Sequence, residues 1–600
     1  FKIELSRRKQ GMIMRKKVDV LSMDNEKARE FFMKPSSYFS QNLPKYFNLG
    51  YLLESAESKL GKKQLKKEMY FENKVYSNFP NVNFLIQTNK TISTYRPITL
   101  LHPYIYVDYV NFLTEIKIWE ELKERFQNLQ EEVKEKIICS SLPFDIETSK
   151  EDDSKKEMAL NFWKSIEQET IKYSLGYNYL LKLDISNFYG SIYTHTLCWA
   201  FHGENYSKEA KNSKNLQNLT GDKCDRKFQW MNYGETVGIP QGNVISDLMS
   251  ELLLAYIDSE LVKKIDDEID YKIIRYRDDY RIFTKRLEDS TLVKRELVVL
   301  LQRFKLNLGE SKTSQTTDII SGSLKEDKMY WIEHDPVTKL TSDKFYRSPK
   351  ILMKKSLEEH KNKKYKTRVF NEFFKKHFHN RTYQATLQKH LLIIKVFSDL
   401  YPNSGQLIAA LHEFEGRLLD LNYKDFRNIG TEVEVLIAIL VDIIKKNPKI
   451  TEIGVKLLST LLKKINFEEF EMKYLESNNS NEVQSDFEVK LAYINSVNHK
   501  LSNSNYNDYL EIWMQRLVVK NLKESTTLSD LYIEQSKNEL VKFCNSIIRG
   551  KEMIQIFNED WLKDEHKIEL SKFINLNEID KLTDIISDDE IYLAEYNQMT

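Results

Sequence analysis

The spacing of hydrophobic and polar residues divides the chain into two parts. Between 177 and 320, short runs of β-branched and aromatic residues alternate with longer runs of helical periodicity, which predicts an α+β unit. After about residue 345 the pattern becomes almost wholly helical. The run TEVEVLIAILVDIIKKNP (431–448) predicts a helix that ends at its proline, and TEIGVKLLSTLLKKI (451–465) predicts a second helix. We expect these two helices to pack as a hairpin.

Two stretches of the α+β unit place carboxylates at the ends of predicted strands. In YLLKLDISNFYGSIYTH (179–195), apolar and polar residues alternate up to Asp184. In IIRYRDDYRIF (273–283), two strand-like runs surround Asp278 and Asp279, which predicts a β-hairpin with both aspartates at its tip. If both stretches belong to one sheet, the hairpin turn delivers Asp278 opposite Asp184.

Three carboxylates in one place repel one another unless cations lie between them. Hard oxygen ligands without His or Cys favour Mg²⁺ or Mn²⁺, and two such ions about 4 Å apart clamp the attacking and leaving oxygens of a phosphoryl transfer. The ordinary alternatives are a polar turn, where aspartate is common, and a solvent-exposed strand end. These two stretches alone do not choose between a metal site and those alternatives.

A glycine-containing turn lies between the two aspartate stretches, in ETVGIPQGNVISDLMSELLLAYID (235–258). Gly238 and Gly242 enclose a Pro-Gln pair, and either Ser246 or Asp247 can cap the apolar helix that follows. A glycine turn before a helix is compatible with the approach of a phosphate or a nucleotide. A plain loop into a core helix explains the same pattern.

Composition indicates a globular chain, with 41% hydrophobic and 30% charged residues. The formal charge of +1 means that any affinity for nucleic acid must come from local patches. The four cysteines form no CxxC pair, which fits a reducing compartment. No run reaches the roughly 18 apolar residues of a membrane span, and the first residues lack the apolar core of a signal peptide. We therefore expect a cytoplasmic protein with no membrane partner.

Taken together, five motifs in order resemble the fingers and palm of reverse transcriptases. The aspartate strand LKLDISNFYGSIYTH (181–195), the turn GIPQGNVIS (238–246) and the hairpin YRDD (276–279) match motifs A, B and C. LNLGESKT (306–313) matches the lysine-bearing motif D, and YRPI (95–98) looks like the fingers motif whose arginine grips the incoming triphosphate. The resemblance implies a metal-dependent nucleotidyltransferase.

The resemblance assigns the metal-binding and catalytic roles to four residues. Asp184 and Asp278 would hold two Mg²⁺ or Mn²⁺ ions, and Asp279 would support the pair. Lys312 would approach the triphosphate and protonate the leaving pyrophosphate.

The resemblance also assigns contacts to the incoming dNTP. Arg96 would bind phosphate, because its planar fork suits phosphate oxygens. Gln241 would lie against the nucleotide or the template strand. Tyr189 falls where the family places an aromatic steric gate, whose ring clashes with a ribose 2′-OH. Ordinary core packing is the alternative role for Tyr189.

The overall layout is most similar to the bacterial abortive-infection reverse transcriptases, and within them to the AbiA type. That resemblance implies reverse-transcriptase-like fingers and palm over 1–345, and a helical domain in place of a thumb over 346–475. A C-terminal helical domain similar to HEPN would follow over 476–600. Active HEPN ribonucleases carry an Arg followed closely by a His, a spacing that the sequence after 345 lacks. We therefore expect this last domain to have no nuclease activity.

The function implied is the synthesis of single-stranded DNA from dNTPs, without a template, in defence against phage. We expect the protein to act as a homo-oligomer. One alternative is an ordinary templated reverse transcriptase with an RNA partner. Another is a nucleic-acid-binding scaffold whose polymerase site is a relict, although the retained aspartates argue against that reading.

Basic residues follow the palm motifs over 344–368, where lysine and arginine far outnumber glutamate. A track for the backbone of single-stranded DNA is one interpretation, and a solvated helix face is the other. In the palm itself, Arg277 either contacts phosphate or offsets the charge of the neighbouring aspartates. The candidate nucleic-acid-binding residues are Arg277, Lys344, Arg347, Lys350, Lys354 and Lys355.

Overall fold

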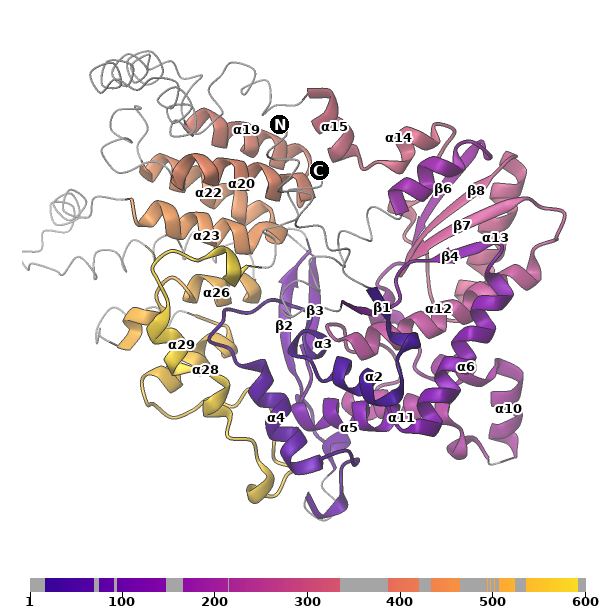
Figure 1. Ribbon diagram of the computed structural model, residues 1–600, viewed down its shortest axis with the longest axis horizontal. Helices are drawn as coiled ribbons and strands as arrows, with labels where there is room; N and C mark the ends of the chain where they lie inside the picture. The colour runs from indigo at the N-terminus through magenta and orange to yellow at the C-terminus, as the bar shows by residue number, and fades with distance from the viewer. Residues whose placement is uncertain are drawn as a thin grey trace, which may run out of the picture.

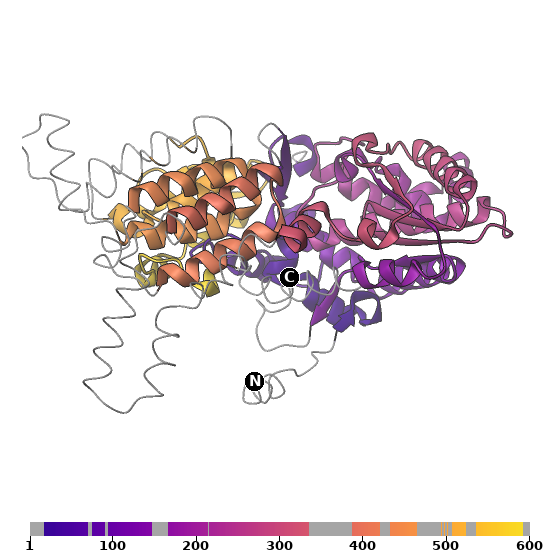
Figure 2. The ribbon, with the colours of Figure 1, turned by 90° about the horizontal axis from the view of Figure 1, so that it is seen from above.

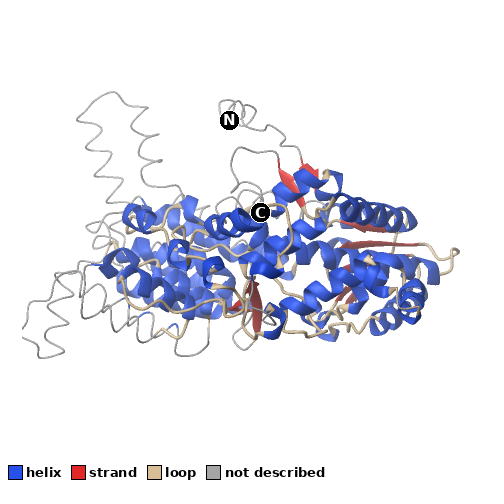
Figure 3. Cartoon of the chain, turned by 90° about the horizontal axis from the view of Figure 1, so that it is seen from below, coloured by secondary structure: helices blue, strands red, loops and turns tan. Residues whose placement is uncertain are grey.

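The chain folds into two lobes (Figures 1 and 2). One lobe holds a five-stranded sheet and its covering helices, and the other is made of helices from the second half of the chain. A two-stranded hairpin lies between them, and Figure 3 shows how the strands gather in one half of the molecule. This computed structural model describes residues 17–69, 75–90, 94–146, 166–213, 215–334, 387–419, 433–464, 494, 497, 501, 507–523 and 536–591.

The five strands of the large sheet follow the order β4-β7-β8-β6-β9. Only β4 and β7 run parallel, and the other neighbours are antiparallel. A two-residue turn joins β7 to β8, so the predicted hairpin is present. The strands are β4 (Ile137–Cys139), β6 (Tyr179–Asp184), β7 (Tyr271–Tyr276), β8 (Asp279–Thr284) and β9 (Ser314–Thr316).

Both faces of this sheet are buried, because its strands carry apolar residues on both sides. Leu181 and Ile282 belong to the main core of the protein, whereas Leu180 and Phe283 belong to a smaller cluster on the opposite face. The long helices of the lobe pack together, with α12 touching both others. They are α6 (Ile116–Val133), α12 (Val244–Lys264) and α13 (Leu287–Arg303).

The fingers region is built around one buried helix and one hairpin. Every residue of α5 (Pro103–Leu113) is buried, and α4 (Leu49–Leu60) packs along it. The hairpin consists of β2 (Phe84–Asn89) and β3 (Tyr95–Leu100), with Thr88 opposite Arg96. This hairpin is the element that reaches toward the helical lobe (Figure 1).

Among the described residues after the palm, four helices form the helical unit, and its two predicted helices do pack against each other. A Cβ on Gly454 would lie 2.5 Å from Ile444 Cγ1, so this glycine permits the close approach of the two helices. The helices are α19 (Leu387–Leu400), α20 (Gly405–Leu419), α22 (Val433–Lys446) and α23 (Thr451–Leu462), with the short 3₁₀ helix η7 (Pro448–Ile450) between the last two. No helix in these described stretches, or elsewhere in the described part of the chain, is both long and apolar enough to cross a membrane.

The C-terminal part packs on the N-terminal part of the chain. Its helices are α26 (Asp508–Gln515), α28 (Glu539–Ile548) and α29 (Leu576–Lys581). The backbone N–H of Asn575 donates to the carbonyl of Tyr46 at 2.8 Å, and Phe47 forms an isolated antiparallel bridge with Ile574. The described residues near 575 therefore complete the packing of residues near 46.

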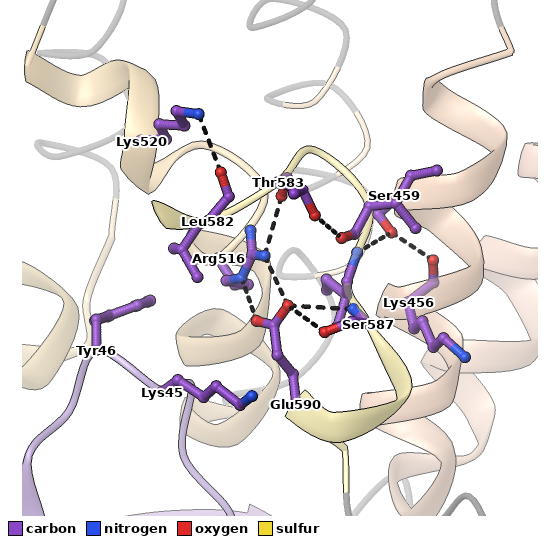
Figure 4. A network of polar contacts seen from close by, with 12 residues as sticks. Lys45, Tyr46, Lys456, Ser459, Arg516, Lys520, Leu582, Thr583, Ser587 and Glu590 are labelled. Atoms are coloured by element: carbon purple, nitrogen blue, oxygen red, sulfur yellow. Dashed lines mark hydrogen bonds and ion pairs between the residues drawn. The ribbon is translucent and has the colours of Figure 1, made fainter. Parts of the chain in front are cut away.

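A short segment, 582–591, which we call the C-terminal strap, ties several elements together (Figure 4). The guanidinium of Arg516, next to α26, donates to both carboxylate oxygens of Glu590, with Nε at 2.7 Å and Nη2 at 2.9 Å. Both side chains are buried. The N–H of Ile586 donates to Ser459 Oγ of α23 at 3.1 Å. The strap is thus joined to α23 of the helical unit by a hydrogen bond and to Arg516, next to α26, by a buried ion pair.

Removing Glu590 should destabilise the fold, because it leaves a buried guanidinium without its carboxylate. A broken buried ion pair costs about 3–5 kcal/mol, whereas an exposed pair contributes about 0–1 kcal/mol. We expect Glu590→Ala to lower the melting temperature clearly, as measured by calorimetry. The control is Asp589→Ala, which breaks the exposed pair of Asp589 with Lys45 in the same strap. Equal melting temperatures for the two variants would contradict this assignment.

Candidate active site

The sheet brings two of the three aspartates face to face. Asp184 ends β6, and the antiparallel register with β8 places Asp279 directly opposite it. Asp278 lies in the turn before β8, where its carbonyl accepts the N–H of Ile185 at 3.1 Å. Asp279, rather than Asp278 as expected, is therefore the cross-strand partner of Asp184, because the two-residue turn ends one residue earlier than the pattern suggested.

The carboxylates of this site are held at an electrostatic cost. Burial raises the pKa of Asp279 to about 6, and the charges of Asp278 and Asp184 add to that rise. Burial also raises the pKa of Asp278, with Asp184 adding to it. One cation compensates directly, since Lys312 Nζ lies 2.6 Å from Asp184 Oδ2. The arrangement favours a bound cation, which would lower the cost of ionising Asp278 and Asp279.

The motif D loop is fixed beside Asp184 by its backbone. The N–H of Gly309 donates to the carbonyl of Asp184 at 2.7 Å, and the N–H of Ser186 donates to the carbonyl of Asn307 at 2.8 Å. A Cβ on Gly309 would lie 3.3 Å from Asp184 Oδ2, so a larger residue would crowd the carboxylate. This loop places Lys312 next to Asp184.

Two of the three arginines around the hairpin make their side-chain hydrogen bonds to groups other than Asp278 and Asp279. Arg275 is buried and donates from Nε to Asp258 at 2.6 Å and from Nη1 to Glu251 at 2.9 Å. Arg281 donates to Thr170 Oγ1 at 3.0 Å. Their hydrogen bonds therefore hold the hairpin to its surroundings instead of pairing with the aspartates.

Arg277 takes part in a chain of contacts that the sequence did not reveal. Its Nη2 lies 2.8 Å from Asp247 Oδ2, and the hydroxyl of Tyr189 donates to Asp247 Oδ1 at 2.5 Å. Arg277 also has φ +49°, the left-handed conformation of a tight hairpin turn. Asp247 thus connects the turn of the hairpin to the aromatic ring that follows the aspartate strand.

The helix that carries Asp247 begins earlier than expected. α12 starts at Val244, and its cap is Asn243, whose side chain accepts the N–H of Ser246 at 2.9 Å. Neither Ser246 nor Asp247 is the cap, because Asn243 precedes both and occupies that role. Asp247 is consequently free to bind Tyr189 and Arg277, and no local pattern in the sequence signals that use.

The glycine turn lies against the fingers hairpin. Gly242 has φ +120°, and a Cβ there would lie 2.7 Å from Ile98 Cγ2. The N–H of Thr99 donates to the carbonyl of Gln241 at 2.8 Å. Arg96 is exposed on the same strand, β3. The structure therefore brings the turn and the YRPI strand together, as the motif comparison implied.

The donor set of the aspartates suits a hard divalent cation, since all three offer only carboxylate oxygens. The possible ligand atoms of these three aspartates lie farther apart than those of another cluster of titratable side chains. Among the described residues, one oxygen or nitrogen from each of His412, Glu415 and Asp588 lies within 4.8 Å of the other two. That second group already holds a cation, because Lys456 Nζ lies 2.8 Å from Glu415 and also contacts Asp588.

The basic residues predicted to follow the palm lie outside the described residues. These are Lys344, Arg347, Lys350, Lys354 and Lys355. The same holds for the proposed boundary between the palm and the helical unit at 345. Their part in binding nucleic acid stays a prediction.

Carboxylates lie at the end of one strand and at an adjacent hairpin turn, beside a lysine and a glycine turn, which is the arrangement that the motif comparison predicts for a nucleotidyltransferase. Residues 90–370 match the family described as reverse transcriptase (RNA-dependent DNA polymerase). These residues therefore form a reverse transcriptase domain, which belongs to the nucleotidyltransferase class of enzymes.

Solved telomerase structures show a weak likeness to this chain. A Candida tropicalis telomerase truncated from its C-terminal domain has 13% identity and a TM-score of 0.28, over 44% of this chain and 54% of that one. The apo telomerase of the same organism has 13% identity and a TM-score of 0.26, over 80% of this chain and 72% of that one. The chain thus spans about half of the truncated telomerase, and no curated protein matches it.

The raised pKa of Asp279 predicts a pH-dependent stability. The folded protein keeps this proton up to a pH of about 6, whereas an unfolded aspartate loses it near pH 4. Ionisation therefore destabilises the metal-free fold as pH rises from about 4 to 6. We expect Asp279→Asn to raise the melting temperature relative to wild type at pH 7 but not at pH 4.

The matched control is Asp267→Asn, which changes an exposed aspartate in the loop before β7. Its melting temperature should differ from that of wild type by the same amount at pH 4 and at pH 7. A stabilisation by Asp279→Asn that is equal at both pH values would contradict the electrostatic explanation.

Proposed function

We propose that the protein is a DNA polymerase of the bacterial abortive-infection type, most like AbiA, which makes single-stranded DNA from dNTPs without a template. The observation that carries the polymerase assignment is the meeting of Asp184, Asp278, Asp279 and Lys312 at one end of the sheet. Motifs from separate parts of the chain converge there, in the order typical of reverse transcriptases. The proposal includes action in the cytoplasm and as a homo-oligomer.

Two Mg²⁺ or Mn²⁺ ions would be held by Asp184 and Asp278, with Asp279 in support. When bound, these ions lower the charge at the reacting phosphate and activate the attacking hydroxyl. Lys312 would be the general acid of the reaction. Its ammonium group pairs with Asp184 at 2.6 Å, and it would donate a proton to the leaving pyrophosphate once the nucleotide is bound.

The incoming nucleotide would be oriented by the fingers and the glycine turn. Arg96 on β3 would bind its phosphates, and Gln241 would lie against the base or the sugar. Tyr189 would be the steric gate, since its ring is buried and its hydroxyl is anchored to Asp247. An anchored ring cannot swing aside to admit a 2′-OH, which favours dNTPs.

Template independence is supported by the layout of the second half of the chain. A helical unit follows the palm in the position where a thumb is expected, and the C-terminal part packs on both the fingers and this unit. The last part, 476–600, would be a HEPN-like domain with a structural role. The basic residues after the palm, together with Arg277, would contact the DNA product.

The templated alternative, with an RNA partner, uses the same site chemistry. Incubation of the purified protein with dNTPs and Mg²⁺, with no nucleic acid added, separates the two hypotheses. We expect long DNA to form under these conditions, as measured by gel electrophoresis after nuclease treatment. DNA that forms only when template and primer are supplied would favour the templated enzyme.

Substitution of the paired aspartates tests the alternative that the protein is a binding scaffold with a relict polymerase site. Changing Asp278 and Asp279 together to Ala should abolish synthesis and protection from phage, because the metal ligands are lost. The matched control changes Asp266 and Asp267 to Ala, an exposed pair in the loop before the same hairpin. It should leave both readouts unchanged. Protection that survives the Asp278/Asp279 change would favour a binding scaffold.

Tyr189 should control the choice of sugar. Tyr189→Ala removes the ring, so we expect the ratio of kcat/KM for dATP to that for ATP to fall by roughly tenfold to a hundredfold, the range of steric discrimination in binding pockets. Tyr189→Phe keeps the ring and should retain most of the selectivity. An unchanged ratio in Tyr189→Ala would assign the residue to core packing.

A further inference from the structure

The helical unit contributes a lysine to the surroundings of the catalytic aspartates. Lys449 lies in η7, between the packed helices α22 and α23. Its backbone N–H donates to Asn403 Oδ1 at 3.0 Å. The Nδ2 of Asn403 in turn donates to the carbonyl of Lys90, at the end of the fingers hairpin, at 3.0 Å. One asparagine thus joins the turn that carries Lys449 to the hairpin that carries Arg96.

A second contact joins the helical unit to the palm. Ser404 Oγ donates to Asp327 Oδ2 at 2.6 Å. Asp327 belongs to α15 (Glu326–His334), and Lys325 precedes this helix directly. The helical unit is therefore fixed to fingers and palm by neighbouring residues, Asn403 and Ser404.

These contacts assemble five basic residues, which we call the cationic cluster. Lys449 interacts electrostatically with Arg96 and Lys90. Lys325 interacts with Lys449 and with Asp279, and Lys90 interacts with Lys312, Asp184 and Asp278. The cluster, drawn from fingers, palm and helical unit, consists of Lys90, Arg96, Lys312, Lys325 and Lys449.

The five basic side chains of the cluster repel one another, while the carboxylate of Asp327 attracts Lys449 and Lys325. All five side chains are exposed to solvent, so a ligand can reach them. Within the described residues, the side chains of Lys90 and Lys449 make no ion pair or hydrogen bond. Surrounding protein lowers the pKa of Lys449, and the charges of Arg96 and Lys90 lower it further. An anion bound among these groups would offset their mutual repulsion.

We propose that Lys449 binds phosphate oxygens of the polymerase substrate, so that the helical unit completes the phosphate site begun by the fingers. This inference rests on the proposed polymerase function. Two sources share the chemistry, the triphosphate of the incoming nucleotide and the phosphodiester of a DNA strand. Lys449 interacts with Arg96 and Lys90, and Lys90 interacts with Asp184 and Asp278. These interactions favour the triphosphate, because a nucleotide held by metal ions at the aspartates would have its phosphates there.

The test compares full-length variants by calorimetric titration with inorganic tripolyphosphate, with dATP and with a single-stranded thymidine oligonucleotide. We expect Lys449→Glu to weaken tripolyphosphate and dATP binding by about tenfold or more, the effect of losing one charge-assisted contact. Lys449→Arg should bind nearly as wild type does. The matched control is Lys445→Glu on α22, which should change nothing, and equal melting temperatures establish that the variants are folded.

The outcomes separate the sources and the two proposals. If Lys449→Glu weakens the binding of the oligonucleotide alone, the result supports the phosphate site and assigns it to the DNA strand. Unchanged affinity for all three ligands, or a wild type that binds none of them, overturns the inference. Synthesis by wild type with unchanged binding in Lys449→Glu leaves the polymerase function standing. Loss of binding in that variant, with no synthesis by wild type, supports the site and rejects the polymerase.

Discussion

The geometry of the candidate active site depends on the contacts of one buried guanidinium, that of Arg275. It joins β7 to two carboxylates of α12, and its Nη1 also donates to the carbonyl of Arg277 in the hairpin turn at 3.3 Å. A buried charge must be paired, so these contacts allow one position of the hairpin relative to the helix. The same helix carries Asp247, which anchors Tyr189. The aspartates and the ring therefore share one rigid support.

In the site around this support, the carboxylates and the basic side chains come from different regions of the protein. Carboxylates gather on the palm, while cations approach from the fingers, the motif D loop and the helical unit. Each group raises the electrostatic energy of the unliganded protein, since like charges lie near one another. Such a site resembles other strained active sites, in which the stability lost locally is recovered when the ligand binds. The cooperation of three regions also explains why the helical unit is fixed so firmly to the hairpin at Asn403.

Sequence reasoning located the palm well, because motifs along β6, the glycine turn and the hairpin are local. The alternating pattern that ends at Asp184 and the paired aspartates predicted a sheet and a hairpin, and both are present. Register was harder: Asp279 lies opposite Asp184 because the turn has only two residues. Asp247 and Lys449 were missed because each acts across long sequence separations, and a lysine in a helical run resembles any solvated one.

The return of the C-terminal part to the fingers has a consequence for biosynthesis. Tyr46 and Phe47 pair with Asn575 and Ile574, which leave the ribosome long after Tyr46 and Phe47 do. Until then the apolar residues near Phe47 lack their partners, and loop closure over so many residues is slow. The packing around Phe47 therefore cannot be completed early in translation. The fingers region of the nascent chain stays accessible to chaperones and proteases until then.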